Sequence, residues 1–399
     1  MLSKAVGSLA VAGLLVSVCV PAAGFAQQVT TGQNITITLR GIVGASVYAQ
    51  DADFGTGNGQ KAQFVTAERD KWVHGGDARN TRLTLAIAGP EVRRGWRGNA
   101  TVEIDFFGSN TSGGSFGDEQ PQPRLRLAYI ELASARTTLR IGQDWSPTLG
   151  TIPQSVSHIG FPLGWGSGGF IGWRFPQIKV IRTLSAPGAA KTTRLQLAVM
   201  SGSWTDEPAG TDNAFSAGER GLPQLEARFD YGTGRFTGYI VGHIDTKDVA
   251  GPDLTSQVVE IGFTTTRGDL SIAANGHVGK AMGHQFAQVV QFGDVKGWGA
   301  WAQLGYNFNP RWSIWGFYGT ERPDEADITN NAVTDATGAA IAVDARRFNS
   351  WLFVPMLRYR SGPYAVGLEW LHSDVQVGPS ANNKLRSGNQ VLLSARYDF

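Results

Sequence analysis

The end of the chain alternates between apolar and polar side chains with a period of two. The apolar positions are Val391, Leu393, Ala395, Tyr397 and Phe399, and the polar positions between them are Gln390, Ser394, Arg396 and Asp398. This alternation predicts a β-strand with one apolar and one polar face. An exposed terminal strand of this kind would promote aggregation in water. The pattern therefore favours a strand whose apolar face meets lipid and whose polar face meets water.

The same alternation recurs from Ile35 onward and predicts about sixteen strands in all. The first apolar series, expected to face outward, are Ile35, Ile37, Leu39, Val43 and Val47; Leu83, Leu85 and Ile87; Val102, Ile104 and Phe106; Leu125, Leu127 and Tyr129; and Leu139 and Ile141. The remaining strands are expected near residues 173–184, 194–201, 223–231, 235–245, 257–266, 269–279, 298–308, 311–319, 350–359, 364–372 and 389–399.

The connections between these strands alternate in length. The short ones are residues 90–96, 134–136, 185–192, 232–234, 267–268, 309–310 and 361–363. The long ones are residues 50–80, 108–123, 144–172, 202–222, 246–255, 280–297, 320–349 and 373–387. This sorting predicts an all-β fold, a transmembrane antiparallel up-and-down β-barrel with short periplasmic turns and long extracellular loops. A secreted sandwich or propeller would have no reason to sort its loops in this way.

Tryptophan positions agree with a membrane barrel. Trp298, Trp312, Trp351 and Trp370 fall near predicted strand ends, where an aromatic belt would meet the lipid interface. The alternative interpretation is that they are core aromatics of a soluble β-protein.

The first 26 residues have the features of a secretory signal peptide. Lys4 precedes an apolar run from Ala5 to Val20, and Gly24 to Ala26 offers a small-residue cleavage site. The run is shorter than the roughly 20 residues of a membrane-spanning helix. We therefore expect a signal peptide at residues 1–26 and a barrel at residues 27–399. The single cysteine, Cys19, lies in the signal, so neither a disulfide nor a cysteine zinc site is expected.

Composition excludes other functional classes. The net charge is +2 and no block is dense in lysine or arginine, so a nucleic-acid partner is not expected. The six histidines are scattered without the spacing of metal ligands, so we expect no metal, no cofactor and no catalytic site. The protein is accordingly not expected to be an enzyme.

Strand parity places many arginines on the inward face of the barrel. The predicted pore-lining and anion-binding residues are Arg40, Arg82, Arg124, Arg126, Arg140, Arg228, Arg358, Arg360 and Arg396, and the predicted pore acids are Glu103, Asp105, Glu226, Asp230 and Glu369. Guanidinium groups on a rigid wall would attract anions and bind carboxylates bidentately. The alternative is that these charges are only the mutually paired, solvated lining that any wide barrel needs.

Residues 144–172 are the predicted constriction loop. The segment is apolar and rich in proline and glycine, and it is expected to fold back against protein. Its candidate functional residues are Asp144, Trp145, Pro153, His158, Phe161 and Trp165.

Three segments carry a resemblance to a known family. They are Arg124 to Leu132 (Arg-Leu-Arg-Leu-Ala-Tyr-Ile-Glu-Leu), Leu139 to Pro147 (Leu-Arg-Ile-Gly-Gln-Asp-Trp-Ser-Pro) and Arg174 to Lys179 (Arg-Phe-Pro-Gln-Ile-Lys). They resemble the fourth-to-sixth-strand region of DcaP-like porins. The resemblance implies a homotrimer of sixteen-stranded barrels that passes small anionic solutes such as dicarboxylates. Those porins often carry an N-terminal coiled coil, and no heptad pattern precedes Ile35 here.

The sequence thus leads to the expectation of a porin in the outer membrane of a Gram-negative bacterium, in contact with outer-membrane lipids. It would allow passive diffusion of small hydrophilic solutes, with a preference for small anions. The alternative is a non-conducting outer-membrane barrel, an adhesin or structural protein that acts through its long extracellular loops.

Overall fold

The computed structural model describes residues 27–30, 34–108, 110–112, 119–169, 173–201, 223–247, 254–283, 285–289, 291–335 and 338–399. The predicted signal peptide, residues 1–26, and positions 170–172 of the predicted constriction loop lie outside the described residues.

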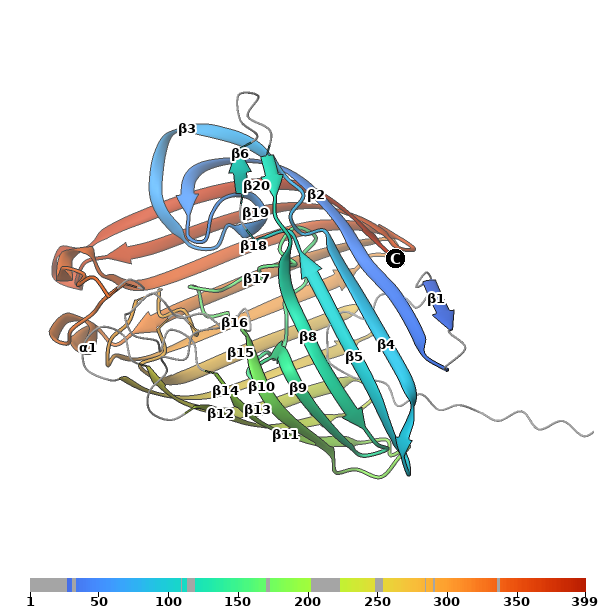
Figure 1. Ribbon diagram of the computed structural model, residues 1–399. Coiled ribbons are helices and arrows are strands. Elements are labelled where there is room, and N and C mark those ends of the chain that lie inside the picture. Colours follow the sequence, from blue (N-terminus) through green and yellow to red (C-terminus); the bar gives the residue numbers. More distant parts are fainter. Residues whose placement is uncertain are drawn as a thin grey trace, which may run out of the picture.

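Sixteen antiparallel strands form a closed ring (Figure 1), which confirms the predicted fold class. Each strand pairs with its neighbours along the chain, and the last pairs with the first from Asp398 opposite Ile42 to Gln390 opposite Gln50. The strands of the ring are β2 (Thr36–Phe54), β4 (Arg82–Arg93), β5 (Trp96–Asp105), β8 (Arg124–Ala133), β9 (Thr137–Trp145), β10 (Arg174–Thr183), β11 (Thr192–Met200), β12 (Gln224–Gly232), β13 (Phe236–Lys247), β14 (Leu254–Arg267), β15 (Leu270–Lys280), β16 (Lys296–Asn307), β17 (Trp312–Pro323), β18 (Arg347–Ser361), β19 (Tyr364–Val377) and β20 (Lys384–Asp398).

Smaller elements lie beside the ring and in its connections. Strands β1 (Gln27–Thr30) and β3 (Val65–Asp77) each pair with a different part of β2. The segment from residue 50 to 80, predicted to be a single long loop, therefore contains a strand. The other elements are the hairpin β6 (Asn110–Ser112) and β7 (Glu119–Pro121), the helix α1 (Glu325–Asn330), and the 3₁₀ turns η1 (Gly59–Lys61), η3 (Val343–Ala345) and η4 (Ser380–Asn382). Within the described ranges, no helix is long and apolar enough to span a membrane.

The two faces of the ring follow the predicted alternation. On β20, Leu393 is 50% exposed and Tyr397 is 45% exposed, whereas Gln390 and Ser394 on the other face are buried. A folded protein does not leave large apolar side chains in contact with water in continuous rows. The outer surface is therefore suited to hydrocarbon, and the inner surface is the polar one.

Aromatic side chains gather near both ends of the strands. Trp298 and Trp370, toward the long-loop end, and Trp312, at the start of β17, are each more than two-fifths exposed. Trp351 is only partly buried and stacks on Tyr318 at a ring-centroid distance of 6.1 Å. This distribution fits belts at two lipid interfaces.

A β-bulge in β8 reverses the predicted parity of that strand. The pairing between β5 and β8 shifts by one residue, from Ile104 opposite Leu125 to Glu103 opposite Leu127. An extra residue in a strand turns every later side chain to the other face. Leu127 and Tyr129, predicted to face outward, lie on the inward face instead. Ile130, which was not in that series, is 69% exposed on the outside.

Long connections and short turns lie at opposite ends of the barrel. Figure 1 shows α1 at one end, and the C terminus and β1 at the other. Three segments from the long-loop end enter the barrel: residues 55–64, residues 146–169, and the described residues between 281 and 295. Their buried side chains, including Phe64, Leu163 and Val289, share one apolar cluster with wall residues such as Phe317 and Leu352. The interior of the barrel is thus narrowed by chain rather than left as an open tube.

The connection that follows β17 has a small core of its own. Ile328 on α1 packs with Val295, Val333 and Phe348. The Arg346 guanidinium donates to the backbone carbonyl oxygens of Ile328, Thr329 and Asn331. Burial lowers the pKa of the Arg346 guanidinium from its usual value.

The orientation of β20 can be tested by placing a charge on its outer face. Leu393→Arg, near the middle of the strand, should destabilise the barrel in lipid vesicles by about 2–4 kcal/mol, because an arginine at the bilayer midplane has that cost. Leu385→Arg, on the same face near the long-loop end, should cost about 0–1 kcal/mol. Urea titrations of folding would measure both, and equal costs would contradict the assigned depth.

Candidate functional site

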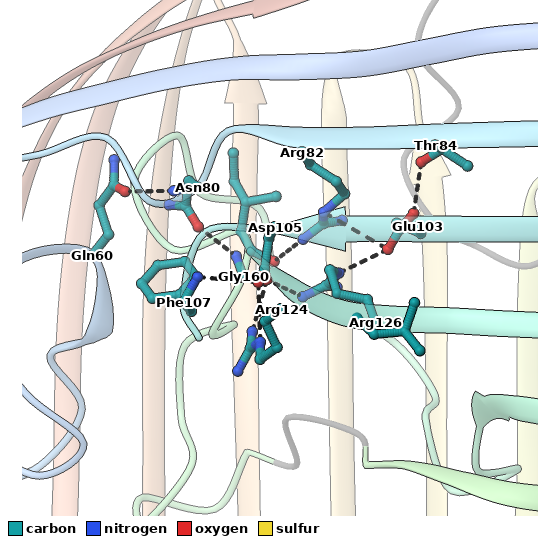
Figure 2. A network of polar contacts seen from close by, with 12 residues as sticks. Gln60, Asn80, Arg82, Thr84, Glu103, Asp105, Phe107, Arg124, Arg126 and Gly160 are labelled. Carbon is teal, nitrogen blue, oxygen red and sulfur yellow. Dashed lines mark hydrogen bonds and ion pairs between the residues drawn. The ribbon is translucent and has the colours of Figure 1, made fainter. Parts of the chain in front are cut away.

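The candidate site contains an ion-pair network on the inward face of the barrel, where β5 ends and β8 begins (Figure 2). Arg124 and Arg126 both contact Asp105, with Nη2 and Nη1 lying 2.7 and 2.8 Å from its Oδ2. Arg126 also donates from Nε to Glu103 Oε1 at 2.7 Å. The register of the two strands brings these groups together, because Asp105 lies directly opposite Arg124. Both of these predicted acids therefore neutralise predicted arginines.

The same network is joined to the inserted loop. Arg82 Nε lies 3.8 Å from Glu103 Oε1, and its Nη2 donates to the carbonyl oxygen of Ile159 at 3.1 Å. Asn80, just before β4, accepts from the backbone N–H of Gly160 at 2.7 Å (Figure 2). Wall and loop thus hold each other in position through charged and amide side chains.

Further cationic side chains in this region lie over two aromatic rings. Phe107 and Phe161 form an edge-to-face pair with centroids 5.0 Å apart. The Lys61 amine lies 5.6 and 5.4 Å from the two ring centroids, and the Arg124 guanidinium lies 5.5 and 4.9 Å from them. Arg79 also lies over Phe107, at 5.0 Å. Such cation–π contacts stabilise a cation without neutralising its charge.

Cationic side chains outnumber carboxylates in this part of the interior. We call this group the cation cluster; it contains Lys61, Arg79, Arg82, Arg124, Arg126 and Arg174, with the acids Asp77, Glu103 and Asp105. Arg174 lies over the Trp145 ring at 4.6 Å, and its Nη1 is buried without a hydrogen-bond partner in the described part of the chain. Burial and the neighbouring guanidinium groups of Arg79 and Arg124 lower the pKa of the Lys61 amine.

A second network lies on β8, β9 and β10. Arg140 contacts Glu131 at 2.5 Å and Asp144 at 2.7 Å, and Lys179 also pairs with Asp144. The Arg140 guanidinium covers the Tyr129 ring at 4.0 Å. Asp144 and Trp145, predicted to belong to the constriction loop, are the last residues of β9, so the loop begins at Ser146.

A third network links β11 and β12 to the loop. Asp230 pairs with Arg194 at 3.1 Å and with Arg228 at 2.7 Å. The Arg228 Nη1 donates to the carbonyl oxygens of Pro147 and Leu149 at 2.8 and 2.7 Å. These contacts fix the first turn of the inserted loop against the barrel wall.

The remaining predicted arginines lie near the short-turn end. Arg360 and Arg396 both pair with Asp398, at 3.0 and 2.5 Å. Arg358 donates from Nε to Ser313 Oγ at 3.2 Å and lies 4.9 Å from the Trp315 ring centroid. Arg40 is exposed and lies opposite the inward Thr84 in the sheet register. Ion pairs with carboxylates are thus formed by at least seven of the nine predicted arginines: Arg82, Arg124, Arg126, Arg140, Arg228, Arg360 and Arg396.

Two of the predicted pore acids hold the inserted loop. Glu369 accepts from the backbone N–H groups of Val156 and Ser157 at 2.9 and 2.8 Å, and from Ser155 Oγ at 2.6 Å. Glu226 accepts from the backbone N–H of Thr148 at 2.9 Å. The structure therefore gives these carboxylates loop partners that sequence parity alone does not indicate.

The predicted loop residues are packed inside the barrel. His158 is buried, with Nε2 2.8 Å from the carbonyl oxygen of Ala62 and Nδ1 2.7 Å from Ser157 Oγ. Burial lowers the pKa of the His158 imidazole. Trp165 packs against Phe64 at a centroid distance of 6.4 Å, and Pro153 is buried as well. Among the described residues, no three histidine, cysteine or acidic side chains are placed to hold a metal ion.

Several members of these networks were not predicted from the sequence. The inward position of Glu131 depends on the parity change in β8, and the sequence alone does not determine which face of β10 carries Lys179. Lys61, Arg79 and Asp77 lie in the segment that was interpreted as a loop. Arg174 belongs to the Arg-Phe-Pro-Gln-Ile-Lys motif, but the motif does not indicate which face of β10 it occupies.

Together these features define a membrane-spanning barrel of the porin type, with a charged inward wall and a loop folded into its interior. Comparison with solved structures gives the same fold. The outer membrane channel DcaP of Acinetobacter baumannii superposes with a TM-score of 0.70 at 18% identity, covering 93% of this chain and 99% of that protein. The resemblance to DcaP-like porins is therefore confirmed for the fold.

Two further structures are similar over most of their length. The trimer form of OmpT from Vibrio cholerae has a TM-score of 0.56 at 13% identity, with coverage of 92% of this chain and 99% of that one. The anion-selective porin from Comamonas acidovorans has a TM-score of 0.55 at 14% identity, with coverage of 92% and 100%. No family model and no curated protein sequence matches the chain.

The role of Glu369 as a loop anchor can be tested directly. Glu369→Ala should lower the local opening free energy of the loop by about 1–3 kcal/mol, because buried backbone donors lose their acceptor. Hydrogen exchange at the Val156 and Ser157 amides would measure it. Glu91→Ala removes an acceptor in an exposed turn and should leave exchange in the loop unchanged. Equal exchange in the two variants would show that Glu369 does not anchor the loop.

Proposed function

We propose that the protein is a porin of a Gram-negative outer membrane that allows passive diffusion of small hydrophilic solutes and favours small anions such as dicarboxylates. The observation that carries the anion preference is the cation cluster, in which six cationic side chains face three carboxylates. No enzymatic activity is part of the proposal.

The electrostatics of the cluster supports this preference. A narrow passage with low-dielectric walls and an excess of one charge raises the local concentration of the opposite ion. Guanidinium groups are suited to carboxylates because they can donate two parallel hydrogen bonds. Five of the six cations, Lys61, Arg79, Arg124, Arg126 and Arg174, lie over aromatic rings, and a cation–π contact stabilises a cation without an opposing charge.

The structural neighbours agree with the proposal. DcaP is described as an outer membrane channel, and the Comamonas protein as an anion-selective porin. OmpT is described in a trimer form, and we extend this to the present chain by proposing a homotrimer in contact with outer-membrane lipids. The dicarboxylate preference comes from the sequence resemblance to DcaP-like porins.

The second candidate function is a non-conducting barrel that acts through its extracellular loops. The packed connection around α1, held by Arg346, is the observation that favours it, because a preformed surface can bind a partner without large ordering costs. Single-channel recording separates the two functions, since a silent barrel would support an adhesin and stepwise currents would support a porin.

The anion preference predicts the effect of removing cluster charges. Lys61→Gln together with Arg174→Gln should lower the anion-to-cation permeability ratio severalfold, because neither side chain makes an ion pair with the described residues. Reversal potentials in a salt gradient would measure the ratio. Lys296→Gln with Lys384→Gln removes two exposed charges at the long-loop end as a matched control. Equal permeability ratios in both variants would show that the cation cluster does not set the anion preference.

The variant Arg358→Ala with Arg360→Ala should lower the anion-to-cation permeability ratio less than the cluster variant does, because Arg360 is neutralised by Asp398.

The inserted loop predicts the effect of its removal. Deleting Pro153 to Gly166 should enlarge the single-channel conductance, because this segment occupies the interior and contacts the far wall at Gln303 and Glu369. Unchanged conductance in a correctly folded barrel would show that the segment does not form the narrowing.

A further inference from the structure

The short connections of the barrel carry exposed cations that the proposed function does not use. Six of these cations are Arg93, Arg94, Lys191, Arg235, Arg267 and Arg311. The exposed acids at this end of the described chain are Glu91 and Asp269, to which the C-terminal carboxylate adds one charge. The opposite end is different, since its connections expose several acids, among them Asp70, Asp294 and Asp324. Among the described residues, the excess of exposed positive charge therefore lies on the rim at the short-turn end, because the exposed cations at the other end are accompanied by acids.

These side chains differ from most of the inward arginines in having no side-chain partner among the described residues. None of the six forms an ion pair or donates a side-chain hydrogen bond to another described residue, whereas seven of the nine predicted inward arginines are paired. No side-chain partner in the described ranges offsets the repulsion among them. A surface of this kind is complementary to an anionic partner.

Aromatic neighbours place the cations at the edge of the membrane. Arg235 directly precedes Phe236, which is 37% exposed, and Arg311 directly precedes Trp312, which is 43% exposed. Phe308, in the same turn as Arg311, is 58% exposed. Exposed aromatic rings of a membrane barrel lie at the level of the lipid headgroups. Because the connections are only a few residues long, their guanidinium groups lie within reach of the same headgroups.

We propose that this basic rim binds the anionic phospholipid headgroups of the leaflet at the short-turn end. Phosphate oxygens would accept hydrogen bonds from the guanidinium groups, and the adjacent rings would contact the acyl-chain region. Each basic side chain near an anionic membrane surface increases affinity about fivefold. Several such side chains around the rim would select anionic over zwitterionic lipid and fix the depth of the barrel.

The test uses the whole folded protein in micelles that contain phosphatidylglycerol and phosphatidylcholine in equal amounts, with bound lipid counted by native mass spectrometry. The wild-type protein should retain mainly phosphatidylglycerol. The variant Arg93→Gln, Arg235→Gln, Arg267→Gln, Arg311→Gln should lose that preference at least tenfold. A matched variant at the other end, Lys71→Gln, Lys296→Gln, Arg322→Gln, Lys384→Gln, should keep it. Heat-dependent gel migration would show that both variants are folded barrels.

The outcomes separate this proposal from its alternatives. Equal lipid preference in the two variants, or no preference in the wild-type protein, would overturn it. A parallel sedimentation assay with purified peptidoglycan tests a carboxylate-bearing cell wall as the partner. Wall binding that is lost in the first variant, without any phosphatidylglycerol preference in the wild type, would also overturn the lipid proposal. Loss of the preference only in the first variant supports it.

Discussion

The structure depends on the closure of its hydrogen-bonded ring. Inside hydrocarbon no water is available to satisfy a backbone N–H or C=O group, so a sheet can cross a membrane only if it has no free edge. The pairing of β20 with β2 removes that edge. Its last bonds run both ways between Gly41 and Phe399, at 2.8 and 3.0 Å. A Cβ on Gly41 would lie 2.4 Å from the carbonyl oxygen of Arg82 and 2.7 Å from the Phe399 ring, so only glycine allows this approach.

Closure of the ring determines which side chains each face of the wall requires. The outer face needs apolar side chains at every second position, and the inner face is left with polar groups and with water. Polar groups of the wall are then available to hold chain that enters from the long-loop end. Glu369 and Glu226 accept from backbone amides of the loop after β9, and Glu321 accepts from Val289 of the connection before β16. The inward carboxylates thus position inserted segments as well as neutralising arginines.

The part of this arrangement that follows from periodicity could be predicted from the sequence. Strand number, the sorting of connections and the outward face of β20 depend only on local alternation. The networks depend on register, which a single added residue changes. The bulge in β8 moved Tyr129 and Glu131 to the inside, and it gave Arg140 partners that parity had assigned elsewhere. Similarly, β3 forms only because the upper part of β2 has an unpaired edge, a tertiary condition that no local pattern contains.

The number of inward arginines and the ion pairs that they form lead to different conclusions about the charge of the interior. A count of inward residues puts arginines ahead of acids, whereas the structure pairs most of the predicted arginines with carboxylates. Paired charges on a rigid wall orient passing solutes more than they attract them, because their fields cancel over distance. The excess of cations lies where the wall meets inserted chain: Lys61 comes from the segment before β3, and Arg174 follows the loop that begins at Ser146. Any preference for anions would therefore depend on how these inserted segments are held, which links selectivity to the same carboxylate anchors that fix the loop.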